Sequence, residues 1–155
     1  MGRSCILRRG VDGITLEEEP MIVYSYYVMD LLHDGHLEML RNSKAIAGED
    51  GILIAGILTD EAVMEKKPRP AMGFGQRLRL AQSIKFVDLA VAQTTYSPLP
   101  NVIAMRPDVL MESSSHTPEA IEEARRVMGS LGGRVVVIPY YPMESSTAIK
   151  NRIKG

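Results

Sequence analysis

The feature that most constrains the fold is an alternation of short apolar runs with segments of helical periodicity. The runs are rich in Val, Ile, Leu, Ala and Tyr and are short enough to be buried strands. Five such runs occur, at 23–28, 51–58, 87–92, 108–112 and 134–138. Strands that alternate with helices form parallel sheets whose faces the helices cover. The pattern therefore predicts an α/β Rossmann-like sandwich with a mostly parallel five-stranded sheet.

The length of the chain predicts one domain with a sizeable core. Of its 155 residues 45% are hydrophobic, but only two are Phe and none is Trp, so Ile, Leu, Val and the ten Met must fill the core. We expect the domain at 21–155. Residues 1–20 alternate basic and acidic patches around Asp12-Gly13. This leader fits either a short hairpin or a loose segment.

Charge and cysteine content narrow the class of protein. The formal net charge is −1, which argues against bulk attraction to nucleic acid or to a membrane surface. The single cysteine, Cys5, excludes an intramolecular disulfide framework. No apolar run approaches the roughly 18 residues of a membrane span. We therefore expect a cytoplasmic protein with neither nucleic acid nor membrane as a partner.

Two histidines lie where the first predicted strand gives way to a helix. They belong to the sequence His33-Asp34-Gly35-His36. The start of a helix offers unpaired N–H groups and the positive end of the helix dipole, and Gly35 allows a close approach. Side chains three positions apart project from the same side of a helix. The motif fits phosphate binding or, alternatively, a solvated histidine pair at a helix cap.

Three more polar segments are expected at the same edge of the sheet. They are the basic loop 65–70, the serines 113–115 after the fourth strand, and Ser145-Ser146-Thr147 before the last helix. Each also has an ordinary explanation, as a solvated loop, a plain loop and helix caps. Because parallel strands end at one edge, where α/β sheets bind ligands, we expect a single active-site edge.

Together these motifs resemble the cytidylyltransferases of the His-x-Gly-His nucleotidyltransferase superfamily. The likeness spans 21–153 and rests on 33–36, 59–61, Lys66, Arg77 with 83–88, and 145–150. The chain departs from the family pattern at three places. It has Tyr27-Val28-Met29-Asp30 for Gly-Thr-Phe-Asp, Ser113-Ser114-Ser115 for Gly-Asp-Asp, and Tyr140-Tyr141 for Arg-Thr. With these departures it is most similar to the cytidylyltransferase domain fused to phosphoenolpyruvate mutase in fosfomycin biosynthesis, which implies a longer bifunctional chain.

The resemblance implies transfer of CMP from CTP to a small phosphonate, 2-hydroxyethylphosphonate, with release of pyrophosphate. It also implies a homodimer, with Mg²⁺ carried by the nucleotide and not held by a protein metal site. The implied catalytic residues are His33, His36 and Lys66. The implied nucleotide-binding residues are Val28, Met29, His33, Gly35, His36, Ser113, Ser145, Ser146 and Thr147. The implied acceptor-binding residues are Tyr27, Asp30, Lys66 and Arg77.

Three alternatives to this function remain open. The acceptor of the cytidylyl group could be 2-aminoethylphosphonate, glycerol 3-phosphate or choline phosphate. The enzyme could be an adenylyltransferase of the same superfamily. The domain could also be a nucleotide-binding module that has lost activity through its altered loops, although the intact His33 and His36 argue against this.

Overall fold

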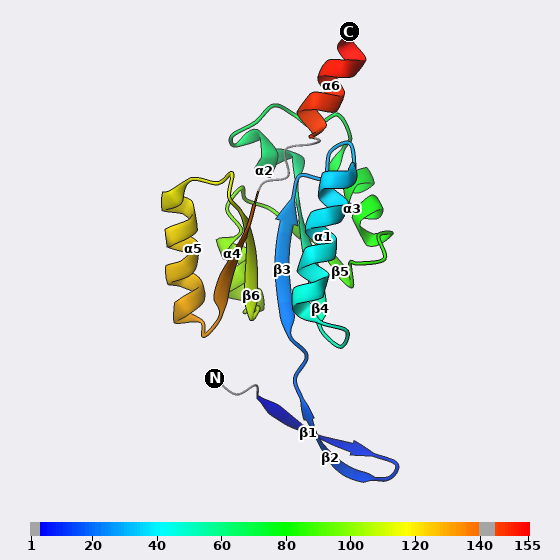
Figure 1. Ribbon diagram of the computed structural model, residues 1–155, viewed down its shortest axis with the longest axis vertical. Helices are drawn as coiled ribbons and strands as arrows, with labels where there is room; N and C mark the ends of the chain where they lie inside the picture. The colour runs from blue at the N-terminus through cyan, green and yellow to red at the C-terminus, as the bar shows by residue number, and fades with distance from the viewer. Residues whose placement is uncertain (1–3, 140–144) are drawn as a thin grey trace.

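The computed structural model describes residues 4–139 and 145–155, and its centre is a five-stranded sheet. The strands are β3 (Ile22–Tyr27), β4 (Ile52–Leu58), β5 (Leu89–Gln93), β6 (Val109–Ser113) and β7 (Arg134–Ile138). All neighbouring pairs are parallel, in the order β5-β4-β3-β6-β7 (Figure 1). The predicted α/β fold with a parallel five-stranded sheet is confirmed.

Helices cover both faces of the sheet (Figure 1). They are α1 (Asp34–Ala47), α2 (Asp60–Met64), α3 (Phe74–Gln82), α4 (Leu99–Met105), α5 (Pro118–Ser130) and α6 (Ser146–Lys154). On one face, Leu40 of α1 and Ala81 of α3 join a buried cluster with Val23 of β3. On the other, Val102 of α4 and Met128 of α5 pack with Tyr24 of β3. Adjacent residues of β3 thus face opposite layers, as a strand requires.

Side-chain caps fix where several helices begin. The hydroxyls of Thr59, Thr117 and Ser145 accept hydrogen bonds from the N–H groups of Ala62, Ala120 and Ala148. The caps before α2 and α6 follow β4 and β7, and α1 begins after β3. The starts of these helices therefore lie at the carboxyl edge of the sheet.

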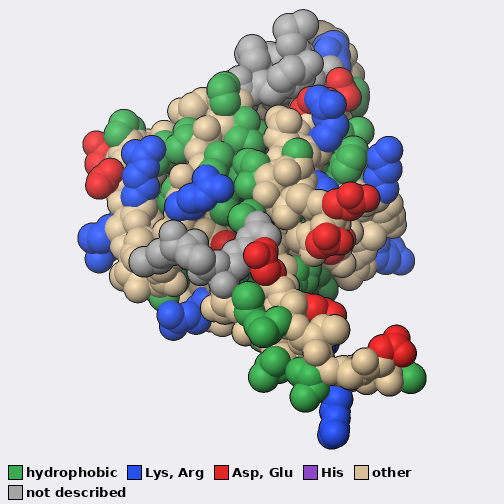
Figure 2. Space-filling model, turned by 60° about the horizontal axis from the view of Figure 1, so that its bottom comes forward, with side chains coloured by type: hydrophobic (Ala, Val, Ile, Leu, Met, Phe, Trp, Pro, Cys, Tyr) green, Lys and Arg blue, Asp and Glu red, His purple; other side chains and the backbone are tan. Residues whose placement is uncertain are grey.

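Outside the sandwich, residues 5–18 form an antiparallel hairpin of β1 (Cys5–Gly10) and β2 (Gly13–Glu18). It extends from the end of the molecule opposite α6 (Figure 1). Leu7, Ile14 and Leu16 are each more than half exposed, and Figure 2 shows hydrophobic side chains gathered at this end. In the described ranges, no helix combines the length and the apolar character that crossing a membrane needs.

Candidate active site

A cavity of about 860 Å³ opens at the carboxyl edge of the sheet. Its wall combines the start of α1, the ends of β3 and β6, the loop after α2 and one side of α6. The structure thus brings into one cavity segments that lie more than a hundred positions apart in the sequence. The cavity is lined by ten of the site residues that the sequence implied: Tyr27, Val28, Asp30, His33, Gly35, His36, Ser113, Ser145, Ser146 and Thr147.

The two histidines cap α1 reciprocally. The Nδ1 atom of His33 accepts from the N–H of Gly35 at 3.0 Å, and the Nδ1 atom of His36 accepts from the N–H of His33 at 3.2 Å. Their ring centroids are 4.0 Å apart. Because each Nδ1 accepts a hydrogen bond, the neutral rings carry their protons on Nε2. Capping and phosphate binding are therefore compatible, since the cap uses only the Nδ1 atom of each ring.

His36 is held in its neutral form. Burial, together with the neighbouring ring of His33, lowers the pKa of His36 to about 4, while the nearby charge of Asp30 acts in the opposite direction. At neutral pH this imidazole is a hydrogen-bond donor and not a cation. Positive charge for an anionic ligand must come from other side chains.

The loop from β3 to α1 is conformationally strained. Met29 and Leu31 adopt left-handed backbone angles, with φ of 61° and 49°, which cost side-chain-bearing residues roughly 1 kcal/mol or more. We predicted that Met29 contacts the nucleotide, and the structure places its side chain fully buried in the core. Tyr27 is also buried, accepts a hydrogen bond from Ser25, and meets the His36 ring edge-on.

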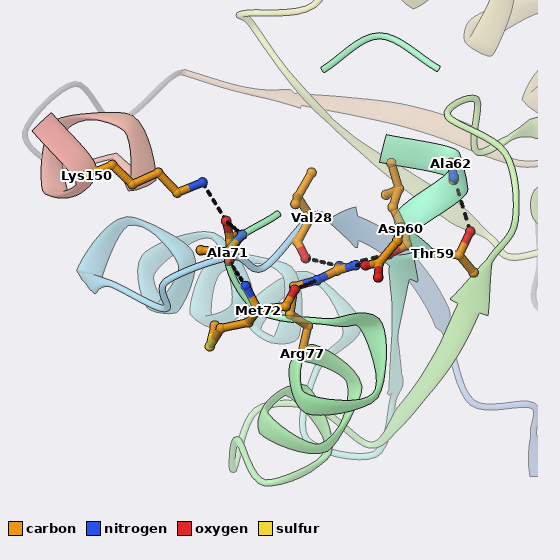
Figure 3. Close-up of polar contacts among 10 residues, drawn as sticks. Val28, Thr59, Asp60, Ala62, Ala71, Met72, Arg77 and Lys150 are labelled. Atoms are coloured by element: carbon orange, nitrogen blue, oxygen red, sulfur yellow. Dashed lines mark hydrogen bonds and ion pairs between the residues drawn. The ribbon is translucent and has the colours of Figure 1, made fainter. Parts of the chain in front are cut away.

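Asp30, a buried residue that lines the cavity, joins three segments. Its carboxylate accepts hydrogen bonds from the N–H groups of Ala71 and Met72 and from Lys150 Nζ at 2.6 Å (Figure 3). Its backbone carbonyl accepts the hydroxyl of Ser146. Burial alone would raise the pKa of Asp30, but the hydrogen bonds from Lys150 and the two N–H groups outweigh it and lower this pKa. The carboxylate is therefore occupied by the protein, where we predicted contact with the acceptor.

Arg77, which we predicted to bind the acceptor, is not among the residues that the structure brings to the cavity. Arg77 is completely buried and does not line the cavity. Its guanidinium donates to the carbonyls of Met72, Val28 and Leu58, and pairs with Asp60 at 2.6 Å (Figure 3). It ties α3 to the ends of β3 and β4, so its function in the described structure is to hold the fold together.

Lys66 is also displaced from its predicted place. Its Nζ lies 4.8 Å from the centroid of the Tyr96 ring, and Lys66 does not line the cavity. Lys67 and Arg69 of the same loop do line it. The sequence correctly indicated a basic loop at this edge, but the path of the loop presents different cations from the one we named.

Other cavity residues were not singled out from the sequence. Lys150 and Lys154 lie on successive turns of α6, and their spacing of four residues could have indicated one face. Tyr26 and His116 also line the wall, and no spacing signal links these two. Tyr140 and Tyr141, which replace a family Arg-Thr pair, lie outside the described residues. Asp88, part of the family motif at 83–88, pairs with Lys44 and the N–H of Leu53, at the start of β4 and away from this cavity.

Comparison with known proteins assigns the chain to a family. The family described as cytidylyltransferase-like matches residues 28–152, which include most of the residues that line the cavity, His33, His36 and Ser145 to Thr147 among them. The chain belongs to the cytidylyltransferase-like family. It is therefore an enzyme of the nucleotidyltransferase class.

Relatives of this cytidylyltransferase-like chain are longer proteins. The bifunctional protein HldE of Acidiphilium cryptum is 35% identical over 128 residues, which cover 81% of the chain and 26% of that protein. HldE of Pelobacter propionicus is 28% identical over 97% of the chain and 31% of that protein. The chain thus spans about a quarter to a third of the length of these relatives.

Solved structures share the cytidylyltransferase-like fold. The lipopolysaccharide core biosynthesis protein from Thermoplasma volcanium superposes with a TM-score of 0.66 at 25% identity, covering 80% of the chain and 98% of that protein. A protein of unknown function from Archaeoglobus fulgidus superposes with a TM-score of 0.62 at 19% identity, covering 81% and 94%. The second likeness concerns the fold alone.

Proposed function

We propose that this cytidylyltransferase-like enzyme transfers CMP from CTP to a small phosphonate, 2-hydroxyethylphosphonate, and releases pyrophosphate. The observation that carries the proposal is the shared cavity of His33 and His36 with Ser145, Ser146 and Thr147. Imidazole N–H donors and a hydroxyl-rich helix start converge there, as binding a polyphosphate chain requires. The sequence resemblance described above supports CTP and a phosphonate as the substrates.

In the proposed reaction a phosphonate oxygen attacks the α-phosphorus of CTP in line. The new bond joins that oxygen to the α-phosphorus, and the bond from the α-phosphorus to the β-phosphate oxygen breaks, so pyrophosphate leaves with its electron pair. The nucleophile is already an anion, so no base is needed. The protein must position two anions and stabilise charge on the leaving group. His33 and His36 do this as donors.

Cations around the cavity neutralise the substrates. Lys150 and Lys154 on α6 line the same cavity as the hydroxyls of Ser145 and Thr147, and together they hold the β- and γ-phosphates. The Ser146 hydroxyl is already donated to the Asp30 carbonyl and positions α6. Lys67 and Arg69 take the role proposed earlier for Lys66 and Arg77 and bind the acceptor phosphonate. The side chains of Lys67 and Arg69 are exposed at the cavity wall, where an incoming anion can reach them. Asp30 positions Lys150 and contacts neither substrate.

Mg²⁺ enters the proposed reaction with the triphosphate. Within 4–139 and 145–155, no three His, Cys, Asp or Glu side chains are grouped so that they could hold a metal ion. The donors that do line the cavity are hydroxyls, imidazoles and cations, which fit phosphate oxygens. We also propose, from the family likeness, that the enzyme is a homodimer.

A second candidate acceptor is a sugar phosphate, with ATP as an alternative nucleotide. It is favoured by the solved relative described as a lipopolysaccharide core biosynthesis protein, which is a quarter identical to this chain. Such an acceptor carries its phosphate at one end, like a phosphonate, and so could use the same cations. The two candidates differ in the rest of the acceptor and in the base of the nucleotide.

A panel of nucleotides and acceptors tests the proposal. Wild-type protein with Mg²⁺ is incubated with CTP or ATP and with 2-hydroxyethylphosphonate, 2-aminoethylphosphonate, glycerol 3-phosphate, choline phosphate or a sugar 1-phosphate. Pyrophosphate is measured, and ³¹P NMR identifies the product. We expect the fastest release with CTP and 2-hydroxyethylphosphonate. Release only with ATP and a sugar phosphate would favour the second candidate, and nucleotide binding without any release would favour a non-catalytic module.

A further inference from the structure

A polar cluster of Tyr26, Glu112 and His116 forms a separate part of the cavity wall. Tyr26 and Glu112 come from the neighbouring strands β3 and β6, and His116 comes from the turn before α5. Glu112 is only 3% exposed, whereas Tyr26 and His116 line the cavity. Tyr26 alternates along β3 with Tyr27, so the cluster lies over the sheet face opposite the one that Tyr27 and α1 share.

The cluster is internally hydrogen-bonded around the buried carboxylate. The Tyr26 hydroxyl lies 2.9 and 3.1 Å from the two oxygens of Glu112, and His116 Nδ1 pairs with Oε2 of the same carboxylate. The rings of Tyr26 and His116 stack with centroids 5.7 Å apart. Burial and the charge of Glu112 raise the pKa of Tyr26, which keeps its hydroxyl protonated as a donor. Glu112 therefore fixes both the orientation and the tautomer of His116.

The other ring nitrogen of His116 is left as a hydrogen-bond acceptor. When Nδ1–H donates to Glu112, Nε2 of the neutral ring carries a lone pair. Among the residues that the structure describes, Nε2 has no hydrogen-bond partner. A phosphate or phosphonate oxygen has no proton to donate and would meet the negative charge of Glu112. The chemistry that fits this position is a hydroxyl group.

We propose that the Glu112–His116 pair is a binding site for a substrate hydroxyl, with His116 Nε2 as the acceptor and Glu112 as the positioning residue. The inference rests on the proposed function for its choice of substrates. The hydroxyl comes either from the acceptor, beyond its phosphonate, or from the ribose of the nucleotide. In either case the site favours a ligand that carries the hydroxyl over a ligand that lacks it.

Equilibrium binding by calorimetry tests the proposal independently of turnover. One pair of ligands is 2-hydroxyethylphosphonate and ethylphosphonate, each titrated in the presence of a CTP analogue with a non-hydrolysable α,β bridge. A second set is CTP with its 2′-deoxy and 3′-deoxy forms. The proteins are wild type, His116→Phe, which keeps a stacking ring without nitrogens, and Glu112→Gln, which changes the partner of Nδ1. Glu123→Gln, on the exposed side of α5, is the matched control.

In one of the two sets, we expect wild type and the control to bind the ligand with the hydroxyl about fivefold to tenfold more tightly than the ligand without it. One hydrogen bond accounts for a difference of this size. His116→Phe should bind both members of that set equally, and Glu112→Gln should weaken the preference. The set that shows the effect identifies the source of the hydroxyl. No preference in wild type, or the same preference in His116→Phe, would overturn the inference. If the binding preference is found but wild type releases no pyrophosphate, the proposed transfer fails and the hydroxyl site stands.

Discussion

At the scale of single residues, the site depends on one imidazole that stays neutral, that of His36. The His36 ring is largely buried and accepts a hydrogen bond from the N–H of His33, and its pKa is lowered to about 4. A neutral donor can bind phosphate oxygens and still act as part of the cap of α1. Charge and hydrogen bonding are thus divided in the proposed site, with charge supplied by Lys67, Arg69 and the lysines of α6.

The lowered pKa of His36 makes stability depend on pH. Between about pH 6.5 and 4 the unfolded chain takes up a proton at His36 that the folded chain refuses, so stability is present above pH 6.5 and is lost as the pH falls through this window. Allowing for partial exposure, we expect a loss on the order of 2 kcal/mol. Urea unfolding at pH 7 and pH 4.5 measures it. His36→Gln can keep the capping bond and should show a smaller loss, whereas equal losses in both proteins would contradict this account.

Arg77 gives a second prediction at this scale. Arg77→Met leaves Asp60 and three carbonyls without their buried partner, so we expect a loss of about 3–5 kcal/mol in the free energy of unfolding. Arg79→Met, two positions along in the exposed part of the same helix, is the control and should change stability little. Unchanged stability of Arg77→Met with a raised KM for the acceptor would restore the binding role that we first predicted.

At the scale of elements, α6 is docked on the cavity through Asp30. The contacts are Lys150 with the Asp30 carboxylate and the Ser146 hydroxyl with the Asp30 carbonyl. These contacts set the position of the hydroxyls that are proposed to hold the triphosphate. The docking of α6 therefore links the far end of the sequence to the loop after β3.

The variant Lys150→Met tests this docking. We expect KM for CTP to rise about tenfold, because a charge-assisted hydrogen bond and a cavity cation are both lost, and amide hydrogen exchange in α6 to accelerate. Lys154→Met removes only a cavity cation and should raise KM without faster exchange. Equal exchange in the two variants would show that the Asp30 contact does not anchor α6.

Much of the element pattern could be predicted from the sequence, because it depends on local apolar runs and caps. The strands β3 to β7 and the cap of Ser145 are local features of this kind. The orientation of cations could not be predicted, because it depends on contacts distant in sequence. Arg77 turns inward because the carbonyls of Val28 and Leu58 converge on it. Lys66 and Lys67 are neighbours, and only the path of the folded loop decides which one lines the cavity.

At the scale of the whole molecule, the sandwich and the hairpin differ in how much of their surface is buried. The five-stranded sheet carries the two largest buried clusters, whereas most residues of β1 and β2 are exposed. An isolated two-stranded hairpin has little stability of its own in water. The carboxyl ends of the strands, where residues of the cavity lie, are at the opposite end of the sheet from this hairpin (Figure 1).

Deleting residues 1–18 should therefore leave the sandwich intact. We expect the free energy of unfolding to change by less than about 1 kcal/mol, because few contacts of the sheet are lost. Urea unfolding followed by circular dichroism measures this change. Gly13→Val, which forces a branched side chain onto a φ of 124°, should disrupt only the hairpin turn. A loss of several kcal/mol in either protein would show that the hairpin supports the core.

The central claim is that the imidazoles of one cavity promote nucleotidyl transfer from CTP. The most direct measurement is pyrophosphate release at saturating CTP and 2-hydroxyethylphosphonate by wild type, His36→Ala and the control Asn42→Ala on the exposed face of α1. Circular dichroism verifies that all three are folded. We expect release by wild type and the control, and a kcat lower by on the order of 10²–10³ in His36→Ala. Near-normal turnover by folded His36→Ala, or no release by wild type, would contradict it.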